Sequence, residues 1–418
     1  MPPTETDAVP ATPFPIALRP AGPYDPPTEF VERKGLGHPD TICDLLAEGL
    51  AQDLAHHGLE RYGALRHFNV DKALLSAGEV RLGGGPDGPF GGGEVVRPSR
   101  IVLAGKVDAR DGMPPLGPLT RAAYARLAAI LPWADLPGDY AIELWLQPSS
   151  ADLLPLLTRG ARPSEQGAPL ANDTSFAVVS LPRSALEAAV HGVEHALAVA
   201  GRSAGLPLGA DIKVMGARQG HDVTVTVAAA VRARDVVDHE AYRRLKEAVR
   251  GIADDAVRAA FRARGRRLDR LEVHVNQADL EPDGAYLTLT GSSAEAGDDG
   301  QVGRGNRVGG LITPHRSMSL EAACGKHPLG HVGKLYHALA WNAAEAVAGL
   351  PGVEGATVRM LSRIGRPVDR PVAVEVEVAG DVDVGGRAGD AIRACVTEAV
   401  AGWAGAARRL IDGGYELV

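Results

Sequence analysis

The sequence predicts an α+β protein whose helices pack on one face of each sheet. Valines alternate with polar residues in stretches such as 222–227, which indicates strands with one covered face. Long amphipathic stretches with apolar residues at helical spacing lie between the strands. The spacing divides the ordered part of the 418-residue chain roughly into thirds, although no sequence repeat relates these thirds.

Residues 1–28 stand apart because they contain nine prolines and few periodic apolar residues. This composition predicts an extended or disordered arm outside the fold. Ordered structure is expected to begin at Phe30 and Val31, and the first helix to follow Pro39 and Asp40. Apolar residues at helical spacing indicate that helix: Ile42, Leu45, Leu46, Leu50 and Leu54.

The remaining elements follow from the same two periodicities. Further helices are predicted at 121–131, 184–200, 239–264, 331–350 and 388–411, with Gly201 as the stop signal of the second of these. Strands are predicted at 101–107, 141–146, 210–214, 222–231, 271–276, 285–290, 357–361 and 372–378.

Composition argues against several classes of protein. The formal charge of −8 disfavours nucleic acid and acidic membrane surfaces as partners. No apolar run approaches the roughly 20 residues of a membrane helix, and the N-terminus lacks a signal-peptide pattern. Three cysteines without a CxxC pair indicate neither a disulfide framework nor a structural zinc site. We therefore expect a cytoplasmic protein that binds neither nucleic acid nor membranes.

Common catalytic and nucleotide-binding signatures are missing from the sequence. It contains no GxxxxGK[ST] motif, no GxGxxG after a strand and no HExxH. The one GxSxG match, at 201–205, follows a predicted helix instead of a strand, which disfavours a serine hydrolase.

Residues 35–40, Gly-Leu-Gly-His-Pro-Asp, lead directly into the first predicted helix. Backbone N–H groups, the His38 imidazole and the Asp40 carboxylate would then lie at an electropositive helix end, where an anion with its metal can bind. An ordinary glycine turn capped by Pro and Asp is the competing interpretation, and these six residues alone favour it.

Residues 291–307 mix glycines with three acids and two arginines after a predicted strand. Acids can hold a divalent metal while arginines bind phosphate oxygens, so this loop is suited to a magnesium polyphosphate. A solvated charged loop is the alternative interpretation.

Lysine is rare, with seven residues against 37 arginines, so each lysine is a candidate for a role that needs a compact ammonium group. Lys326 lies in Cys-Gly-Lys-His-Pro, and Lys334 follows it at the start of a predicted helix. Lys213 lies in a predicted strand on the same face as Asp211; a surface lysine is an equally good interpretation there.

Six blocks occur in one order between residues 29 and 415: VERKGLGHPDTICD, PLANDTSF, DIKVMG, GSSAEAGDDGQVGRGNRVGGLITP, CGKHPLGHVGKLY and LSRIGRP. Together they resemble the methionine adenosyltransferase (S-adenosylmethionine synthetase) family of the archaeal type. The resemblance implies synthesis of S-adenosylmethionine from ATP and L-methionine, with release of phosphate and pyrophosphate. It also implies Mg²⁺ as cofactor, with a monovalent cation as a further candidate, and a homodimer with active sites at the shared interface.

The fold that this resemblance implies has three β-α-β-β-α-β units related by pseudo-threefold symmetry. We place these units at 29–140, 141–265 and 266–418 and expect them to be interleaved. The first would carry the GHPD motif, the second LANDTSF and DIK, and the third GDDGQVGRGNR and CGKHP.

The resemblance also assigns roles to individual residues. It implies catalytic roles for His38, Lys213, Arg304 and Lys326. It implies that Asp40 and Asp298 hold metal. Substrate or nucleotide binding is implied for Asp173, Asp298, Arg307, Lys334, Ser150 and Asp152.

The sequence departs from the family pattern in two places. A GQGSxD block is replaced by QPSSAD at 147–152, and an NTDQ block by Asn-Val-Asp-Lys at 69–72. The same displacement on a different nucleoside triphosphate or methionine analogue therefore remains an alternative. A third hypothesis is a non-catalytic homologue that binds nucleotide.

Overall fold

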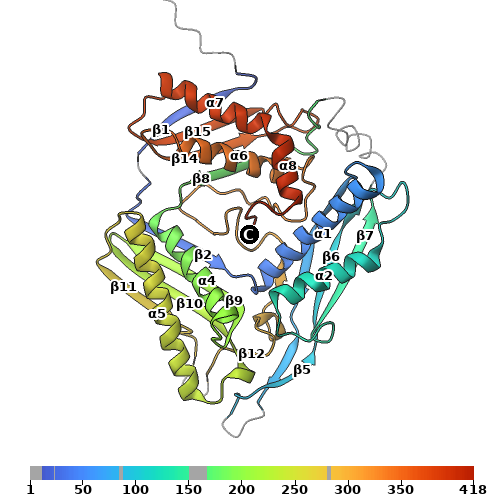
Figure 1. Cartoon of the computed structure of the whole chain (residues 1–418), viewed down its shortest axis with the longest axis vertical. Helices are drawn as coiled ribbons and strands as arrows, with labels where there is room; N and C mark the ends of the chain where they lie inside the picture. The colour runs from blue at the N-terminus through green and yellow to red at the C-terminus, as the bar shows by residue number, and fades with distance from the viewer. Residues whose placement is uncertain (1–11, 23, 84–87, 150–166, 280–283) are drawn as a thin grey trace, which may run out of the picture.

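The computed structural model describes residues 12–22, 24–83, 88–149, 167–279 and 284–418. In this part of the chain, three sheets with helices on one face surround a centre where the C-terminus lies (Figure 1). The mixed α+β class predicted from the sequence is confirmed. None of the described helices is long and apolar enough to cross a membrane.

The first sheet has the strand order β13-β3-β6-β7. Its strands are β3 (Phe68–Ser76), β6 (Ser99–Val107), β7 (Tyr140–Pro148) and β13 (Gly300–Gln301). Helices α1 (Pro39–Tyr62) and α2 (Leu116–Ile130) pack on it and on each other. The hairpin of β4 (Glu79–Leu82) and β5 (Gly93–Arg97) lies beside it (Figure 1).

The second sheet has the order β11-β10-β9-β2, with β12 also paired to β10. Its strands are β2 (Thr28–Lys34), β9 (Leu208–Gln219), β10 (Asp222–Arg232), β11 (Arg270–Val275) and β12 (Leu287–Thr288). Helices α4 (Ala185–Ser203) and α5 (His239–Ala263) cover one face and enclose an apolar core with the strands.

The third sheet has the order β1-β15-β14-β8. Its strands are β1 (Ile16–Ala21), β8 (Phe176–Leu181), β14 (Val353–Leu361) and β15 (Ala373–Gly380). Helices α6 (Val332–Ala348), α7 (Arg387–Ala401) and α8 (Trp403–Ile411) pack near it, and their apolar residues join those of the first unit in one core cluster.

Helix α1 forms for local reasons that the sequence displays. His38 is the N-cap, and its Nδ1 accepts a hydrogen bond from the backbone N–H of Asp40 at 3.2 Å. Pro39 occupies the first turn, where its missing N–H costs nothing. Gly63 ends the helix with φ +67°, a conformation that favours glycine.

Two predicted helices differ from the observed ones: the end of one is wrong, and the other is two helices. Helix α4 continues through Gly201 to Ser203, and Gly201 lacks the positive φ of a C-terminal stop. A Cβ at Gly201 would lie 3.1 Å from the Leu208 carbonyl oxygen. The helix predicted at 388–411 is divided at Gly402 into α7 and α8.

The proline-rich segment contributes more than an arm. Residues 16–21 form β1, which pairs in parallel with β15 over the register Ile16 to Val374 through Ala21 to Ala379. Its one proline, Pro20, is tolerated because β1 is an edge strand, where a missing N–H on the open side of the strand breaks no hydrogen bond of the sheet. The expectation that this segment lies outside the fold is therefore wrong for residues 16–21.

The sheets also cross the unit boundaries expected at 140/141 and 265/266. β7 joins the first sheet, β8 joins the third sheet, and β11 joins the second. The strand predicted at 285–290 is reduced to Leu287–Thr288. Each sheet therefore combines strands from more than one of the segments 29–140, 141–265 and 266–418 or from the residues before them.

The C-terminal segment connects the units at the centre. The carboxylate of Glu416 accepts hydrogen bonds from Arg183 at 2.6 Å and Arg33 at 3.3 Å, and it lies 2.8 Å from Nε2 of His191. Its backbone carbonyl accepts from the N–H of Gly309 at 2.9 Å. Burial raises the pKa of Glu416, but the His191 hydrogen bond and the two arginines outweigh burial and lower the pKa to about 2.

Because this pKa lies below the usual value of 4.5, ionised Glu416 stabilises the fold above pH 4.5. The contribution is lost as the pH falls from 4.5 toward about 2. We expect Glu416→Gln to lower the urea midpoint at pH 7, with a smaller difference from the unmodified chain at pH 3.5. The control is Glu60→Gln at an exposed position of α1. A pH-independent difference would contradict this assignment.

Candidate active site

The N-terminus of α1 gathers charged groups from three segments. The carboxylate of Asp40 accepts hydrogen bonds from Lys34 Nζ at 2.8 Å and from the backbone N–H of Gln301 at 2.9 Å. Lys34 also donates to the carbonyl of Arg304 at 3.1 Å. The helix end therefore holds the glycine-rich loop 291–307 through Asp40 and Lys34.

His38 lies between two acidic residues predicted to hold metal. Its Nδ1 accepts the N–H of Asp40, so the proton of the neutral ring is assigned to Nε2. Nε2 lies 3.9 Å from a carboxylate oxygen of Asp298. Asp40 is buried, while the Asp298 side chain is 53% exposed and available to a ligand.

A buried acid, Asp211, supports the loop from the second sheet. Its carboxylate accepts hydrogen bonds from Ser293 Oγ at 2.6 Å and Tyr286 OH at 3.2 Å. Ser293 Oγ also lies 3.3 Å from Asp298. Burial raises the pKa of Asp211, and the neighbouring His38 opposes that shift.

Helix α1 contacts two loops through acids spaced four residues apart. One is the glycine-rich loop 291–307, and the other contains Gly325 and Lys326. Asp40 accepts from Gln301, Asp44 accepts from the N–H of Gly303 at 2.8 Å, and Glu48 accepts from the N–H of Gly325 at 3.1 Å. This spacing places the three carboxylates on one helix face. Figure 1 shows α1 running from the centre along the first unit.

Asp44 is packed tightly against the loop. A Cβ at Gly305 would lie 2.7 Å from its Oδ2, which explains why glycine is needed there. Burial raises the pKa of Asp44 to about 7, and the Gly303 N–H opposes the shift. Oδ2 has no hydrogen-bond partner among the described residues.

The cations of this region differ in their surroundings. Arg304 is exposed, and no hydrogen bond of its side chain to another described residue is found. Arg307 instead donates to the carbonyls of Gly303 at 2.9 Å and Gly305 at 3.1 Å, so it braces its own loop. Lys213 lies opposite Lys34 in the β2–β9 register and pairs with Glu32 at 3.1 Å.

Lys326 lies in a second group. Its side chain is only 3% exposed, contacts Glu321, and lies 4.0 Å from Asp71 of β3. Burial lowers the pKa of Lys326 to about 8, opposed first by Asp71; Asp173 is close enough to oppose it too. The Lys326 ammonium therefore faces Glu321 and Asp71, and its loop and the loop 291–307 both contact α1, through Glu48 and Asp44.

Lys334 contacts the backbone of Lys326, and its side chain is only 1% exposed. Its ammonium donates to both oxygens of Glu48 at 2.6 Å and to the carbonyl of Lys326 at 3.1 Å, which uses its three hydrogens. Burial raises the pKa of Glu48, and Lys334 opposes that shift. Lys334 thus holds the Lys326 backbone instead of offering its charge to a ligand.

Two predicted residues, Ser150 and Asp152, lie outside the described residues. The adjoining departure at 69–72 is described: Asp71 faces Lys326, and Lys72 is an exposed side chain that pairs with Asp71 at 2.6 Å.

Comparison with known proteins identifies the arrangement. The family model described as S-adenosylmethionine synthetase (AdoMet synthetase) matches residues 21–414. The chain is 40% identical over 408 residues to the S-adenosylmethionine synthase of Halobacterium salinarum, covering 93% of this chain and 95% of that one. The chain belongs to the S-adenosylmethionine synthetase family.

Further relatives agree with this assignment. The S-adenosylmethionine synthase of Methanocaldococcus jannaschii is 42% identical over 363 residues, covering 84% of this chain and 86% of that one. A solved structure described as an unusual S-adenosylmethionine synthetase from Campylobacter jejuni shares the fold, with a TM-score of 0.56 and 15% identity over 85% of this chain and 83% of that one.

The acids of this synthetase fit a magnesium ion that arrives with a polyphosphate. No cluster of three or more His, Cys, Asp or Glu side chains suited to a metal is found among the described residues. Mg²⁺ commonly uses one or two carboxylates, phosphate oxygens and water, so a complete protein cage is not required. Asp298, which is exposed, and Asp40, which is buried, lie 3.9 Å from Nε2 and Nδ1 of His38, and such carboxylate oxygens are of the kind that Mg²⁺ prefers.

Five residues that pack in this region were given no role from the sequence: Lys34, Asp44, Glu48, Asp71 and Asp211. The first helix carries a usable signal, because the spacing Asp40, Asp44, Glu48 repeats every four residues. Asp71 and Asp211 carry no comparable signal, since their neighbours come from distant segments.

We expect Lys334→Met to lower the free energy of unfolding by about 3–5 kcal/mol, because it leaves Glu48 buried without a countercharge. Lys334→Met combined with Glu48→Gln should recover part of this loss. Urea unfolding at pH 7 of both single variants, the double variant and the unmodified chain measures the coupling. A double variant no more stable than Lys334→Met would contradict the buried pair.

Proposed function

We propose that this chain synthesises S-adenosylmethionine from ATP and L-methionine and releases phosphate and pyrophosphate. Family membership over residues 21–414 is the observation that carries the proposal. The packing of the GHPD helix end against the GDDG loop supports it, because Asp40 and Asp298 then lie beside one imidazole. The relatives give no support to the alternative of a different nucleotide or methionine analogue.

The chemistry needs positioning and charge compensation. The sulfur of methionine is a neutral nucleophile, so its attack on C5′ of ATP requires no general base. The departing tripolyphosphate carries about four negative charges, which cations in a site shielded from water stabilise most strongly. We assign this role to Lys213, Arg304 and Lys326, with His38 beside the bridging oxygen.

Bound Mg²⁺ would supply further neutralisation of the phosphate oxygens. Asp298 and Asp40 are the residues we assign to hold it. Asp173 is assigned to a substrate, as are Ser150 and Asp152 on the basis of the resemblance alone. A monovalent cation and a cytoplasmic location remain predictions.

We also propose that the three sheets are units related by pseudo-threefold symmetry. Each has four strands in its main path, and each packs against a helix pair: α1 with α2, α4 with α5, and α6 with α7. The helices of all three lie on the near side in Figure 1.

We infer a homodimer from the strand residues. Large apolar side chains are exposed on all three sheets: Leu74, Trp145, Phe30, Met215, Phe176 and Leu361. Contiguous exposed apolar patches mark protein interfaces, and we propose that these side chains belong to such a patch. Light scattering of the purified chain should give twice the 43.5 kDa of one chain, and a monomer at micromolar concentration would contradict it.

Incubation with ATP, L-methionine and Mg²⁺ should produce S-adenosylmethionine, phosphate and pyrophosphate, detected by mass spectrometry and phosphate analysis. We expect Lys326→Ala to lower turnover by roughly 10² to 10³, because one charge contact to the leaving group is lost. Exposed Lys106→Ala is the matched control. Absence of product above a boiled control would refute the proposed activity.

The lowered pKa of Lys326 predicts an alkaline limit to activity. Because its ammonium loses charge near pH 8, kcat/KM should fall as the pH rises through about 8. Lys326→Arg should keep its charge and lose this limb, while turnover falls because a planar guanidinium replaces a compact group. A pH profile unchanged in shape in Lys326→Arg would assign the limb to another group.

A further inference from the structure

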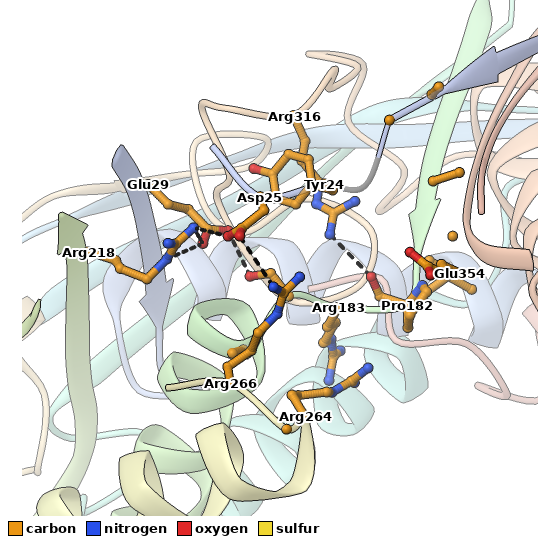
Figure 2. A pocket seen from close by; sticks show the side chains of 18 of the residues that line it. Tyr24, Asp25, Glu29, Pro182, Arg183, Arg218, Arg264, Arg266, Arg316 and Glu354 are labelled. Carbon is orange, nitrogen blue, oxygen red and sulfur yellow. Dashed lines mark hydrogen bonds and ion pairs between the residues drawn. The ribbon is translucent and has the colours of Figure 1, made fainter. Parts of the chain in front are cut away.

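A cavity of about 520 Å³ lies between the second and third sheets, and Figure 2 shows residues that line it. One wall comes from the end of α5 and the β9–β10 turn, and the opposite wall from β8, β14 and β15. Of the candidate active-site residues that the structure describes, none lines this cavity. Its volume is sufficient for a small organic ligand.

The lining of the cavity is rich in arginine, although the whole chain carries a formal charge of −8. Its lining contains six arginines and four carboxylates. The arginines are Arg183, Arg218, Arg264, Arg266, Arg267 and Arg316. An anion can be attracted only by those arginines that no carboxylate already neutralises.

Three of the arginines, which we call the inner arginines, are neutralised by buried or partly buried acids. The pairs are Arg183 with Glu416 at 2.6 Å, Arg218 with Glu29 at 3.4 Å and Arg316 with Glu187 at 2.6 Å. Arg316 also lies over the ring of Tyr24 at 3.8 Å and donates to the carbonyl of Pro182 (Figure 2). These three side chains build the wall and retain little free charge.

The other three arginines, which we call the outer arginines, are Arg264, Arg266 and Arg267 at the end of α5. Gly265 has φ +61°, its N–H donates to the Arg262 carbonyl, and the N–H of Arg266 donates to the Phe261 carbonyl. This hydrogen-bond pattern is a Schellman motif, which fixes the turn and satisfies the last helix carbonyls. The arginine side chains therefore project from a defined backbone.

The outer arginines have weak partners or none. Arg266 pairs with Asp25 at 3.2 Å, but the two side chains are 47% and 49% exposed. Arg267 pairs with Asp269 on the surface. Arg264 has no carboxylate partner among the described residues. Exposed ion pairs are worth little, so an incoming anion can replace them.

We propose that this cavity binds a small polyanion, an oligophosphate or polycarboxylate compound, at the arginines of the α5 turn. Planar guanidinium groups bind paired oxyanion oxygens through two parallel hydrogen bonds. On the opposite wall, Glu377 is paired with Arg19 and Arg359, and Glu354 would repel an anion, so the charged groups of the anion face Arg264 and Arg266. Any organic part then extends between the two sheets.

Hydrogen–deuterium exchange of the full chain tests the site with pyrophosphate and with citrate as separate probes, against NaCl of equal ionic strength. We expect slower exchange at residues 261–268 with at least one probe, and the more protective probe identifies the anion class. Arg264→Ala with Arg266→Ala should weaken that effect by about tenfold or more in apparent dissociation constant. The matched control, Arg243→Ala with Arg244→Ala, changes two exposed arginines elsewhere on α5 and should keep it.

Three results would overturn the proposal: protection that NaCl reproduces, protection equal in the Arg264/Arg266 variant, or protection confined to residues 36–44 and 298–307. The readout is binding at a named segment and does not require turnover. Failure of this inference and failure of the proposed synthase activity are therefore observed separately.

Discussion

The acidic face of α1 is the constraint on which the site depends. Three carboxylates one helical turn apart would repel one another unless each has its own partner. Lys34 and backbone N–H groups serve Asp40, the Gly303 N–H serves Asp44, and Lys334 serves Glu48. The two loops that carry Asp298 and Lys326 are held to one rigid helix as a result.

This arrangement concentrates desolvated charge. Burial raises the pKa of Asp44 to about 7 and lowers that of Lys326 to about 8. Opposite shifts of an acid and a base in one region show that both resist ionisation in their surroundings. The same exclusion of water strengthens the electrostatic contacts that the ionised groups make with a charged ligand, which is a property expected of a site that handles polyphosphate.

The centre of the molecule links this site to its surroundings. Arg33 binds Glu194, Glu416 and the carbonyl of Gly310, and the next residue, Lys34, reaches Asp40. The C-terminal segment therefore contacts the same loop that α1 holds from the other side. The connected residues belong to all three sheets with their helices (Figure 1). The packing of these three parts against one another therefore determines the geometry of the site.

The sequence by itself determined where most of the helices lie, and it determined the two motif loops that carry Asp298 and Lys326 and the kinds of charge on these loops. Apolar spacing, the His38 cap and the motif residues act within a few positions, so α1, α5 and the Asp298 loop could be predicted. Only the tertiary structure decided that β1 pairs with β15, that Lys334 is buried against Glu48, and that Asp211 supports Ser293. Strand pairing and burial join segments that lie far apart in the chain, and local periodicity contains no information about which distant surface will cover a given side chain.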